Sequence, residues 1–410
     1  MYIILGGLGI QAQTILHFLF TQTIESMVVV DLPDSPPKSF TNRWVKFKDR
    51  VIYRCSHDHW EEDYDKGHVV ISCLPTEHNL SCAYDCISRK WNMVDLGGVT
   101  STVRKQFALN NAARNAGITI IPDCGLAPGI VSSLAAMYAS AGWSSVEIFC
   151  GGIPKFPVPP LSYSKMFYSG GVIKEFSGIA QEIRDGKIVN VPARSGKELV
   201  FIPGFGVLEA VVTSGGVSTT PEHLHLSRFS YKTLRYPGHI EYLEKYVFSQ
   251  PDPAKFLDEL LDDVDPDNPD VIILHIRLRD ETGGQATRSF FWEYDKDMGF
   301  SAMSQATGYV AAATAMAIHD KKVCQGVIGM HELDAEKLML TVENMPNQFM
   351  ETPPTFQGKL KCMIQLEIFM AVPTNYPCYW KRWDTSGTLS MELSSTSPQT
   401  DGKQCSLEIL

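Results

Sequence analysis

Residues 1–12 read MYIILGGLGIQA, an apolar run that passes directly into a glycine-rich turn. Residues 2–5 predict a strand, and QAQTILHFLF over 11–20 carries apolar residues at helical spacing. Between them, Gly7, Gly9 and Ala12 fit the pattern G-x-G-x-x-G/A. A strand, this turn and a helix in that order are typical of the first unit of a Rossmann-type dinucleotide-binding domain.

Each position of the turn has a physical role in that pattern. The first glycine permits a sharp turn, the second lets the backbone approach a pyrophosphate, and a small third residue lets the helix pack on its strand. The helix N-terminus presents free N–H groups to the phosphates. We therefore predict that Gly7, Leu8, Gly9, Ile10 and Gln11 bind a nucleotide. The alternative is a plain strand-to-helix connection.

Asp31 ends the apolar run VVVDL, roughly twenty residues after the turn, where an acid binds the ribose hydroxyls in this fold. A carboxylate at that place repels a 2′-phosphate, and no arginine follows it directly. The residues therefore favour NAD over NADP as the cofactor. The alternative is a surface aspartate that stands there by coincidence.

Two later loops follow predicted strands of the same region. Cys73, Leu74 and Pro75 follow VVIS, and Gly97 and Gly98 follow NMVDL. Ligands of open α/β sheets bind at the carboxyl ends of the strands, so we predict that both loops flank the nicotinamide. Ordinary strand-to-helix turns are the alternative for each loop.

Strand and helix patterns alternate over the first third of the chain, which implies βαβ units and a parallel sheet. The strands are expected in VVVDL, VIYRC, VVISCLP, NMVDLGG and ITIIPDCG, and the helices over 79–90, 100–117 and 128–142. From about Val146 strand-like runs dominate, namely EIFCGGI, EIRDGKIVNV, EAVVT, VIILHIRLR and SFFWEYD, with an acidic helix over 253–264. They suggest a second α+β domain with a mixed or antiparallel sheet.

The expected fold class is therefore α/β, with a Rossmann-type parallel sheet domain followed by the α+β domain. We expect the NAD-binding domain over 1–125 and a substrate and dimerisation domain over 126–300. A helix rich in small residues begins near 301, and residues 301–345 are expected to return to the first domain. The Ser/Thr-rich segment 351–410 is expected to be a mobile tail.

The bulk composition excludes several classes of function. The 410 residues are 44% hydrophobic and 20% charged, with a formal net charge of −10. An acidic chain is a poor partner for nucleic acid or anionic membranes. We find no apolar run of spanning length and no secretory signal, and expect a cytoplasmic protein with reduced cysteines. No metal site is expected, because Cys55, His57 and His59 have no matching second pair, and Asp263–Asp267 lack the glycine of a calcium loop.

Several further segments occur in a characteristic order. They are VDLGG (94–98), IPDCGLAPGIVSSLAA (121–136), VPPLSYSKMF (158–167), EAVVTSGGVSTTPE (209–222), KTLRYPGHIEYL (232–243), FSAMSQATGYVAA (300–312) and GVIGMHEL (326–333). This set resembles the saccharopine dehydrogenase/reductase-like superfamily, and within it looks closest to the L-lysine 6-dehydrogenases. The resemblance covers residues 1 to about 336 and leaves out the C-terminal segment.

The resemblance implies hydride transfer between a nicotinamide and a carbon that bears an amine. Saccharopine reductases usually read GLDPG where this chain reads GLAPG, with Ala127 in place of the acid. Those reductases also usually prefer NADP. The expected function is therefore NAD-dependent oxidative deamination of L-lysine at the ε-carbon, which gives the semialdehyde or its cyclic imine, ammonia and NADH. Alternatives are a saccharopine-type or carboxynorspermidine-type reductase and an NAD-binding regulator without turnover. By analogy we expect a homo-oligomer, such as a homodimer.

The reaction needs a base, because the lysine ε-ammonium, with a pKa of ~10.4, must first lose a proton. Asp123 and His239 are the candidates, and each has a structural alternative, as a turn cap and as a hydrogen-bonded interdomain histidine. Arg235 is the candidate clamp for the substrate carboxylate, against a structural salt bridge. The resemblance favours the functional roles of Arg235 and His239. Cys124 is expected to line the pocket.

Overall fold

The computed structural model describes residues 1–166, 168–262, 268–343 and 345, together with three short strands at 350–352, 378–380 and 391–393. Residues 1–355 form one compact unit and 356–410 a second. Most of 351–410, predicted as a mobile tail, and Asp263–Asp267 lie outside the described residues.

The first sheet is parallel throughout, in the order β15-β6-β5-β4-β1-β2-β3. Its strands are β1 (Tyr2–Leu5), β2 (Met27–Asp31), β3 (Val51–Cys55), β4 (Val69–Ser72), β5 (Asn92–Asp95), β6 (Thr119–Ile121) and β15 (Gly326–Val327). The chain reverses its strand order between β1 and β4, so the carboxyl ends of these two strands border a crevice where this fold binds ligands.

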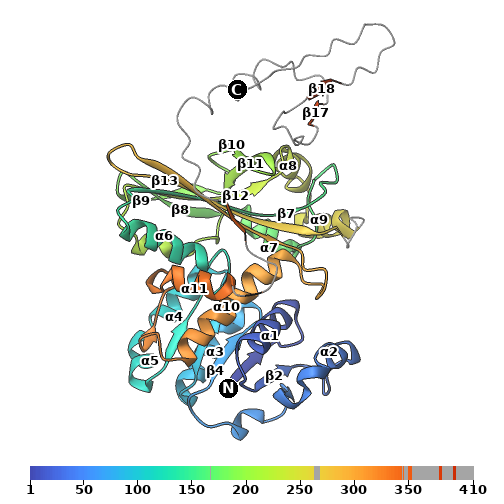
Figure 1. Cartoon of the computed structure of the whole chain (residues 1–410), viewed down its shortest axis with the longest axis vertical. Coiled ribbons are helices and arrows are strands. Elements are labelled where there is room, and N and C mark those ends of the chain that lie inside the picture. The colour runs from blue at the N-terminus through green and yellow to red at the C-terminus, as the bar shows by residue number, and fades with distance from the viewer. Residues whose placement is uncertain are drawn as a thin grey trace. The chain divides into compact units, whose positions relative to one another are not determined.

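Helices cover both faces of this sheet, because successive strand residues point to opposite sides. Tyr2 and Ile4 join the core with α1 (Ile10–Gln22) and α10 (Ala302–His319), whereas Ile3 packs toward α3 (Asn79–Arg89) and α5 (Asn110–Ala116). Figure 1 shows α1 and α10 side by side across the lower part of the molecule, and the two helices are in contact. The remaining helices of this part are α2 (Lys38–Arg43), α4 (Thr100–Phe107) and α11 (Ala335–Glu343).

The second sheet is mixed, in the order β10-β11-β12-β7-β13-β14-β16, with β8 beside β12 and β9 beside β8. Only β12 and β7 run parallel among its described pairs. The strands are β7 (Ser145–Pro154), β8 (Ile179–Arg184), β9 (Lys187–Pro192), β10 (Glu198–Ile202), β11 (Gly206–Val212), β12 (Arg228–Arg235), β13 (Asp270–Arg279), β14 (Gln285–Glu293) and β16 (Met350–Thr352). The predicted fold class is confirmed.

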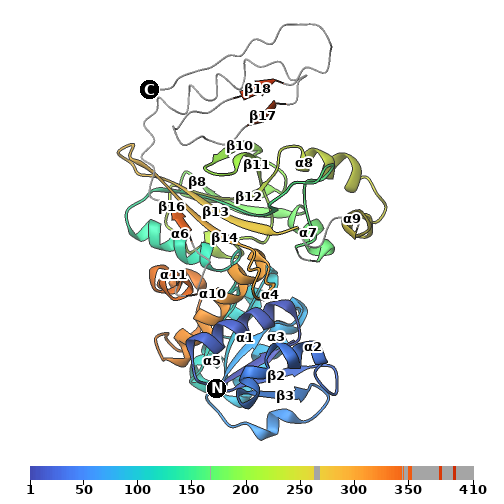
Figure 2. The same ribbon diagram turned by 45° about the vertical axis from the view of Figure 1, so that its right-hand side comes forward.

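One core joins the two sheets. Residues on one face of the second sheet, such as Ile148, Leu274 and Trp292, share a hydrophobic cluster with α6 (Ile130–Ser140) and α10. Figure 2 shows α6, α10 and α11 between the two sheets. The small residues of α10, including Ala311 and Ala312, are fully buried there, which permits close approach on both sides.

Two predicted elements were wrong in detail. The single helix expected over 100–117 is two helices, α4 and α5, and the strand expected over 182–191 is the hairpin β8–β9, which turns at Asp185 and Gly186 with positive φ. Strands β10, β12, β15 and β16 were not foreseen. The other short helices are α7 (Ser169–Glu175), α8 (His239–Tyr242) and α9 (Pro253–Asp262), and β17 (Cys378–Trp380) pairs with β18 (Met391–Leu393) in the second unit.

Candidate functional site

The glycine turn joins β1 to α1 and leaves the start of the helix open. Gly6, with φ of 70°, makes the left-handed bend that we had assigned to Gly7. Gly7 is required for a different reason, since a β-carbon there would overlap Val29 Cγ1 on β2. Gly9 and Ile10 are exposed where α1 begins, and Gly9 caps the helix without a side chain. The N–H groups of the first helical turn therefore face outward, which suits a phosphate.

Asp31 lies at the carboxyl end of β2 and bonds to the turn itself. Its Oδ2 accepts from the Leu8 amide at 2.8 Å, and its Oδ1 accepts from the Leu32 amide at 2.7 Å. The carboxylate is half-buried, so part of it stays accessible to a ribose hydroxyl. Arg54, on the neighbouring strand β3, forms an ion pair with Asp63 instead of turning to this position. The local charge is thus negative, which disfavours a 2′-phosphate.

The two later loops meet the glycine turn at the same edge of the sheet. Cys73 N donates to Leu5 O at 2.9 Å, and a β-carbon on Gly6 would touch the Cys73 backbone and Leu74. Pro75 ends the loop, and Thr76 Oγ1 then donates to Gly97 O at 2.9 Å, which ties the loop after β4 to that after β5. Burial raises the pKa of the Cys73 thiol to about 12, so the thiol stays protonated at neutral pH.

Asp123 follows β6 at this edge and packs directly on the Gly97–Gly98 turn. Gly98 N donates to Asp123 Oδ1 at 3.2 Å, and a β-carbon at Gly97 would overlap that same oxygen. Asp95, at the end of β5, lies next to it and accepts from the Asp123 amide at 3.4 Å. The structure therefore brings Gly97, Gly98 and Asp123 together, with a second carboxyl group that the sequence analysis did not select.

Burial governs the charge of both carboxyl groups. Desolvation and the charge of Asp95 raise the pKa of Asp123 to about 7, although Ser218 and Gly98 lower it in part. The Ser218 hydroxyl approaches the carboxyl group without completing a hydrogen bond of standard geometry. Desolvation also raises the pKa of Asp95 to about 6 against three hydrogen bonds that lower it. A carboxyl group that titrates near neutrality can take and release a proton.

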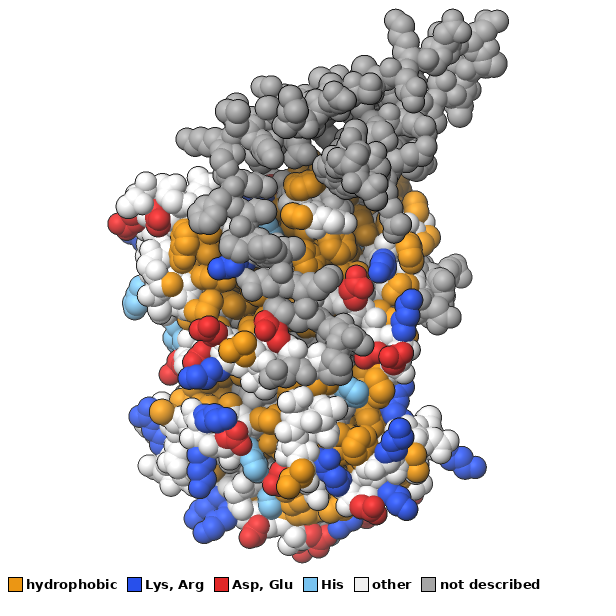
Figure 3. Space-filling view, viewed as in Figure 1, with side chains coloured by type: hydrophobic (Ala, Val, Ile, Leu, Met, Phe, Trp, Pro, Cys, Tyr) orange, Lys and Arg blue, Asp and Glu red, His pale blue; other side chains and the backbone are white. Residues whose placement is uncertain are grey.

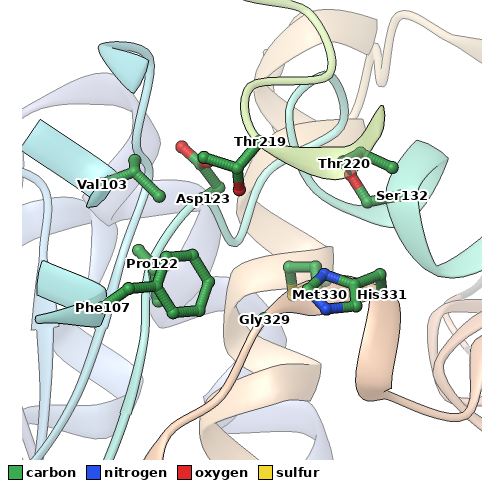
Figure 4. A pocket seen from close by; sticks show the side chains of 10 residues that line it. All are labelled: Val103, Phe107, Pro122, Asp123, Ser132, Thr219, Thr220, Gly329, Met330 and His331. Carbon is green, nitrogen blue, oxygen red and sulfur yellow. Dashed lines mark hydrogen bonds between the residues drawn. The ribbon is translucent and has the colours of Figure 1, made fainter. Parts of the chain in front are cut away.

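A small pocket borders Asp123 on the side of the second sheet (Figure 4). Its lining comes from four parts of the chain, namely Val103 and Phe107, then Pro122, Asp123 and Ser132, then Thr219 and Thr220, and finally Gly329, Met330 and His331. The hydroxyls of Ser132 and Thr220 lie 2.6 Å apart, and the ring of His331 stacks on that of His223 at 4.0 Å. The lining joins apolar side chains, hydroxyl groups and the Asp123 carboxyl group.

Arg235 and His239 form a separate group under α7. Both are fully buried, and the Arg235 guanidinium lies over the rings of Tyr163 and Phe176, at 4.9 and 5.4 Å. It pairs with Glu175 at 3.6 Å. The His239 ring contacts the same two aromatic side chains. Among the described residues, no direct contact links Asp123 to Arg235 or His239.

Among the described residues, three buried polar atoms of this group make no hydrogen bond of standard geometry: Arg235 Nε, Tyr163 Oη and His239 Nε2. His239 Nδ1 lies 2.9 Å from Leu161 O, so that nitrogen carries the proton and Nε2 holds a lone pair. Desolvation and Arg235 lower the pKa of His239 to about 3, which keeps the ring neutral. Of the two side chains, Asp123 is therefore the one whose pKa lies near neutral pH.

A loop over 213–220 runs from the arginine group to Asp123. At one end Thr213 Oγ1 lies 2.7 Å from Thr233 Oγ1, which also donates to Glu175 at 2.7 Å. At the other end are Ser218 and Thr219. Glu175 and Asp95 are the residues that sequence reasoning missed, and the only signal for Asp95 was its place at a strand end beside Gly97. Cys124 is fully buried behind Asp123, and burial raises the pKa of its thiol.

The described helices are all too short or too polar to cross a membrane.

No group of three or more His, Cys, Asp or Glu side chains in the described part of the chain is arranged to hold a metal ion. Figure 3 shows acidic and basic side chains interspersed over the visible described surface.

The family model of the saccharopine dehydrogenase C-terminal domain matches residues 125–345. The chain is similar to saccharopine dehydrogenase [NADP(+), L-glutamate-forming] of Pyricularia oryzae, with 28% identity over 152 residues, 34% of this chain and 33% of that protein. It is also similar to mitochondrial alpha-aminoadipic semialdehyde synthase of Rattus norvegicus, with 33% identity over 131 residues, 30% of this chain and 14% of that protein. The match thus spans a third or less of these relatives.

Two solved structures share the fold. Apo saccharopine dehydrogenase (L-Glu forming) from Saccharomyces cerevisiae has a TM-score of 0.65 and 18% identity, covering 86% of this chain and 99% of that one. The homospermidine synthase from Legionella pneumophila in complex with NAD has a TM-score of 0.64 and 10% identity, covering 92% and 94%. At these identities the likeness concerns the fold.

Proposed function

The chain belongs to the saccharopine dehydrogenase C-terminal domain family, and from this membership we propose that it is an NAD-dependent oxidoreductase of an amine-bearing carbon. The specific reaction is the oxidative deamination of L-lysine at its ε-carbon. The observation that carries the proposal is Asp123, a buried carboxyl group with a pKa of about 7 beside the Gly97–Gly98 turn. The Asp123 carboxyl group would act as the base, next to the edge of the first sheet where a nicotinamide would lie.

The nucleotide fits the first sheet. The open N-terminus of α1 and the absence of a β-carbon at Gly9 suit a pyrophosphate, and the half-buried Asp31 suits unphosphorylated ribose. When bound, NAD would supply a hydride acceptor. The protein's own groups would bind it through Gly7, Leu8, Gly9, Ile10, Gln11 and Asp31, with Cys73, Leu74, Pro75, Gly97 and Gly98 beside the nicotinamide.

The substrate chemistry assigns one task to each remaining group. The ε-ammonium gives a proton to Asp123, which leaves a nitrogen lone pair, and the ε-carbon then gives up a hydride. Water adds to the imine and ammonia leaves, so RCH2NH3⁺, NAD⁺ and water yield RCHO, NH4⁺, NADH and H⁺. Arg235 would hold the substrate carboxylate, since its Nε is a buried donor without a partner.

A saccharopine-type reductase is the second candidate. The similarity to a relative named saccharopine dehydrogenase favours it. Ala127, in place of the acid of GLDPG, and the negative charge at Asp31 count against it. The regulator without turnover remains the third candidate and predicts nucleotide binding only.

The deciding experiment follows reduced-nicotinamide absorbance with the purified full chain, NAD and L-lysine. Parallel reactions contain saccharopine with NAD and with NADP. A signal with lysine and NAD supports the proposal, whereas a signal only with saccharopine replaces the substrate. Binding of NAD without turnover of any amine would favour the regulator.

Arg235→Lys tests the proposed carboxylate anchor. Lysine keeps the charge and the pairing with Glu175 but loses the bidentate fork, so we expect KM for the amino acid to rise by about tenfold while NAD binding stays unchanged. Lys245→Gln, at a cation exposed near Tyr246, is the control. A loss of NAD affinity in Arg235→Lys would contradict the assignment.

A further inference from the structure

Asp123 has a backbone conformation that is uncommon for a residue other than glycine. Its φ is 61°, in the left-handed region that non-glycine residues rarely occupy. Residues held there by their surroundings cluster at functional sites. Here the support comes from Asp95, whose carboxylate accepts from Asp123 N at 3.4 Å and whose carbonyl accepts from Cys124 N at 2.7 Å.

Asp95 is itself held from three sides. Gln106 Nε2 on α4 donates to its Oδ2 at 2.6 Å, and Gly97 N donates to its Oδ1 at 2.8 Å. Asp95 and Gln106 are both completely or almost completely buried. Gln106 Oε1 has no partner, so nothing but the bond to Asp95 orients this amide among the described residues.

The two carboxyl groups have unequal sets of donors. Asp95 accepts three hydrogen bonds, whereas Asp123 accepts one from Gly98 and lies near the Ser218 hydroxyl. Donors stabilise the ionised form, and two like charges this close oppose each other. Asp95 therefore holds the resident negative charge, and Asp123 is the group that takes up and releases a proton.

Other groups face Asp123 from the elements around it. Cys124 lies next to it in sequence, Ser218 and Thr219 face it from the 213–220 loop, and His331 lies on the pocket lining (Figure 4). Burial and His223 lower the pKa of His331 to about 4, and burial raises that of Cys124. Both are therefore neutral near pH 7, so Asp95 is the nearby charge that acts on Asp123.

We propose that Asp95, oriented by Gln106, is a positioning residue that holds Asp123 in its left-handed conformation and sets the pH at which Asp123 releases its proton. Its contribution to turnover rests on the proposed function, in which Asp123 is the base. Its effect on the Asp123 carboxyl group does not.

Asp95→Asn removes the charge and keeps the shape. Gln106 can turn its amide so that the unpartnered Oε1 accepts from the new Nδ2, which preserves the packing. We expect Asp123 to titrate lower by on the order of one pH unit, the size of a neighbouring like charge in a partly screened site. The acid limb of the pH profile of kcat/KM should move to lower pH by the same amount. Asp85→Asn, an exposed acid on α3, is the matched control.

The titration is read by ¹³C NMR of the full chain labelled at aspartate carboxyl carbons, with Asp123→Asn to identify the signal. Gln106→Met is the second variant, which keeps both carboxyl groups but removes a donor from Asp95. The lower of the two apparent pKa values of the Asp95–Asp123 pair should then rise.

The outcomes separate the two proposals. If Asp123 titrates as in the wild type in Asp95→Asn, and Gln106→Met leaves both steps unchanged, the positioning role is overturned. A shifted titration without turnover of any amine supports the positioning role and overturns the proposed reaction. A lower kcat/KM with an unmoved acid limb would mean that Asp95 is merely structural.

Discussion

At the scale of the residue, Asp123 is the proposed base and the centre of the candidate site. It combines burial, a positive φ and contact with a glycine turn at the carboxyl edge of the first sheet. Each feature has a separate cause, and together they give a carboxyl group whose charge can change near neutral pH. Arg235 and His239 are also buried, but they pack against the ring of Tyr163 instead.

Asp123→Asn removes the proposed base and keeps the shape of the side chain. Asparagine tolerates positive φ and can still accept from Gly98 N, so we expect the fold and NAD binding to persist. We expect kcat/KM to fall by 10²–10⁴-fold, the usual contribution of general base catalysis. In the wild type, kcat/KM should rise with pH through about 7, since the base acts only when deprotonated. A variant with normal activity would exclude Asp123 from the reaction.

The proposed preference for NAD over NADP rests on Asp31. The double substitution Asp31→Ser with Leu32→Arg replaces a negative charge by a positive one, so the ratio of NADP to NAD affinity should rise at least about tenfold. Leu8 N also loses its acceptor, which should weaken both cofactors somewhat. Fluorescence titration with the two reduced cofactors measures the ratio. An unchanged ratio of the two affinities would indicate that the ribose does not bind at Asp31.

At the scale of the element, α10 connects the two sheets through hydrogen bonds at its N-terminus. Its N-terminus is capped twice, by the Ser301 side chain on Ser304 N and by Asp270, the first residue of β13. The Asp270 oxygens accept from Ala302 N and Met303 N at 2.7 and 2.9 Å. One carboxyl group thus fixes the helix of the first sheet to a central strand of the second.

Asp270→Ala should therefore destabilise the molecule through the start of α10. The two helix N–H groups lose their acceptor in a buried place, and we expect a loss of about 2 kcal/mol in the free energy of unfolding. Urea unfolding followed by circular dichroism measures it. Asp297→Ala, at an exposed acid in the preceding loop, should change stability little. Equal effects of the two substitutions would contradict the capping role.

At the scale of the whole molecule, buried histidines make the fold sensitive to acid. Desolvation lowers the pKa of His239 to about 3, and those of His275 and His331 to about 4, in three different places. In the unfolded chain histidine takes up its proton near pH 6.5. Their contribution to stability is therefore present above about pH 6.5 and is lost as pH falls toward 4. The raised pKa values of Asp95 and Asp123 act in the opposite direction.

The difference between variants isolates one histidine from these opposing groups. His275→Asn keeps a polar partner for Ser289 and cannot be protonated, so it should lose less stability than the wild type between pH 6.5 and 4. His78→Asn, at an exposed histidine, should follow the wild type. Thermal unfolding across this range is the measurement, and parallel curves for all three proteins would refute the prediction.

The short-range patterns of the chain predicted strands β1 to β6 of the first sheet, the glycine turn and the place of Asp31, but not the edge strand β15. Strand alternation, helical spacing and glycine geometry act over a few residues, so they can be read without knowledge of distant contacts. The change of character near Val146 likewise foretold a second sheet, and the family resemblance was confirmed at the level of the saccharopine dehydrogenase family. The closeness to lysine dehydrogenases stays a prediction.

Only the tertiary structure decided which polar groups face each other. The ends of β5 and β6 and the helix α4 bring Asp95, Asp123 and Gln106 together. Likewise, Arg235 at the end of β12, a strand not foreseen, forms an ion pair with Glu175 at the end of α7. Burial then sets their charges: it raises the pKa of Asp123 and lowers that of His239. Desolvation depends on every neighbour at once, which no short stretch of sequence records.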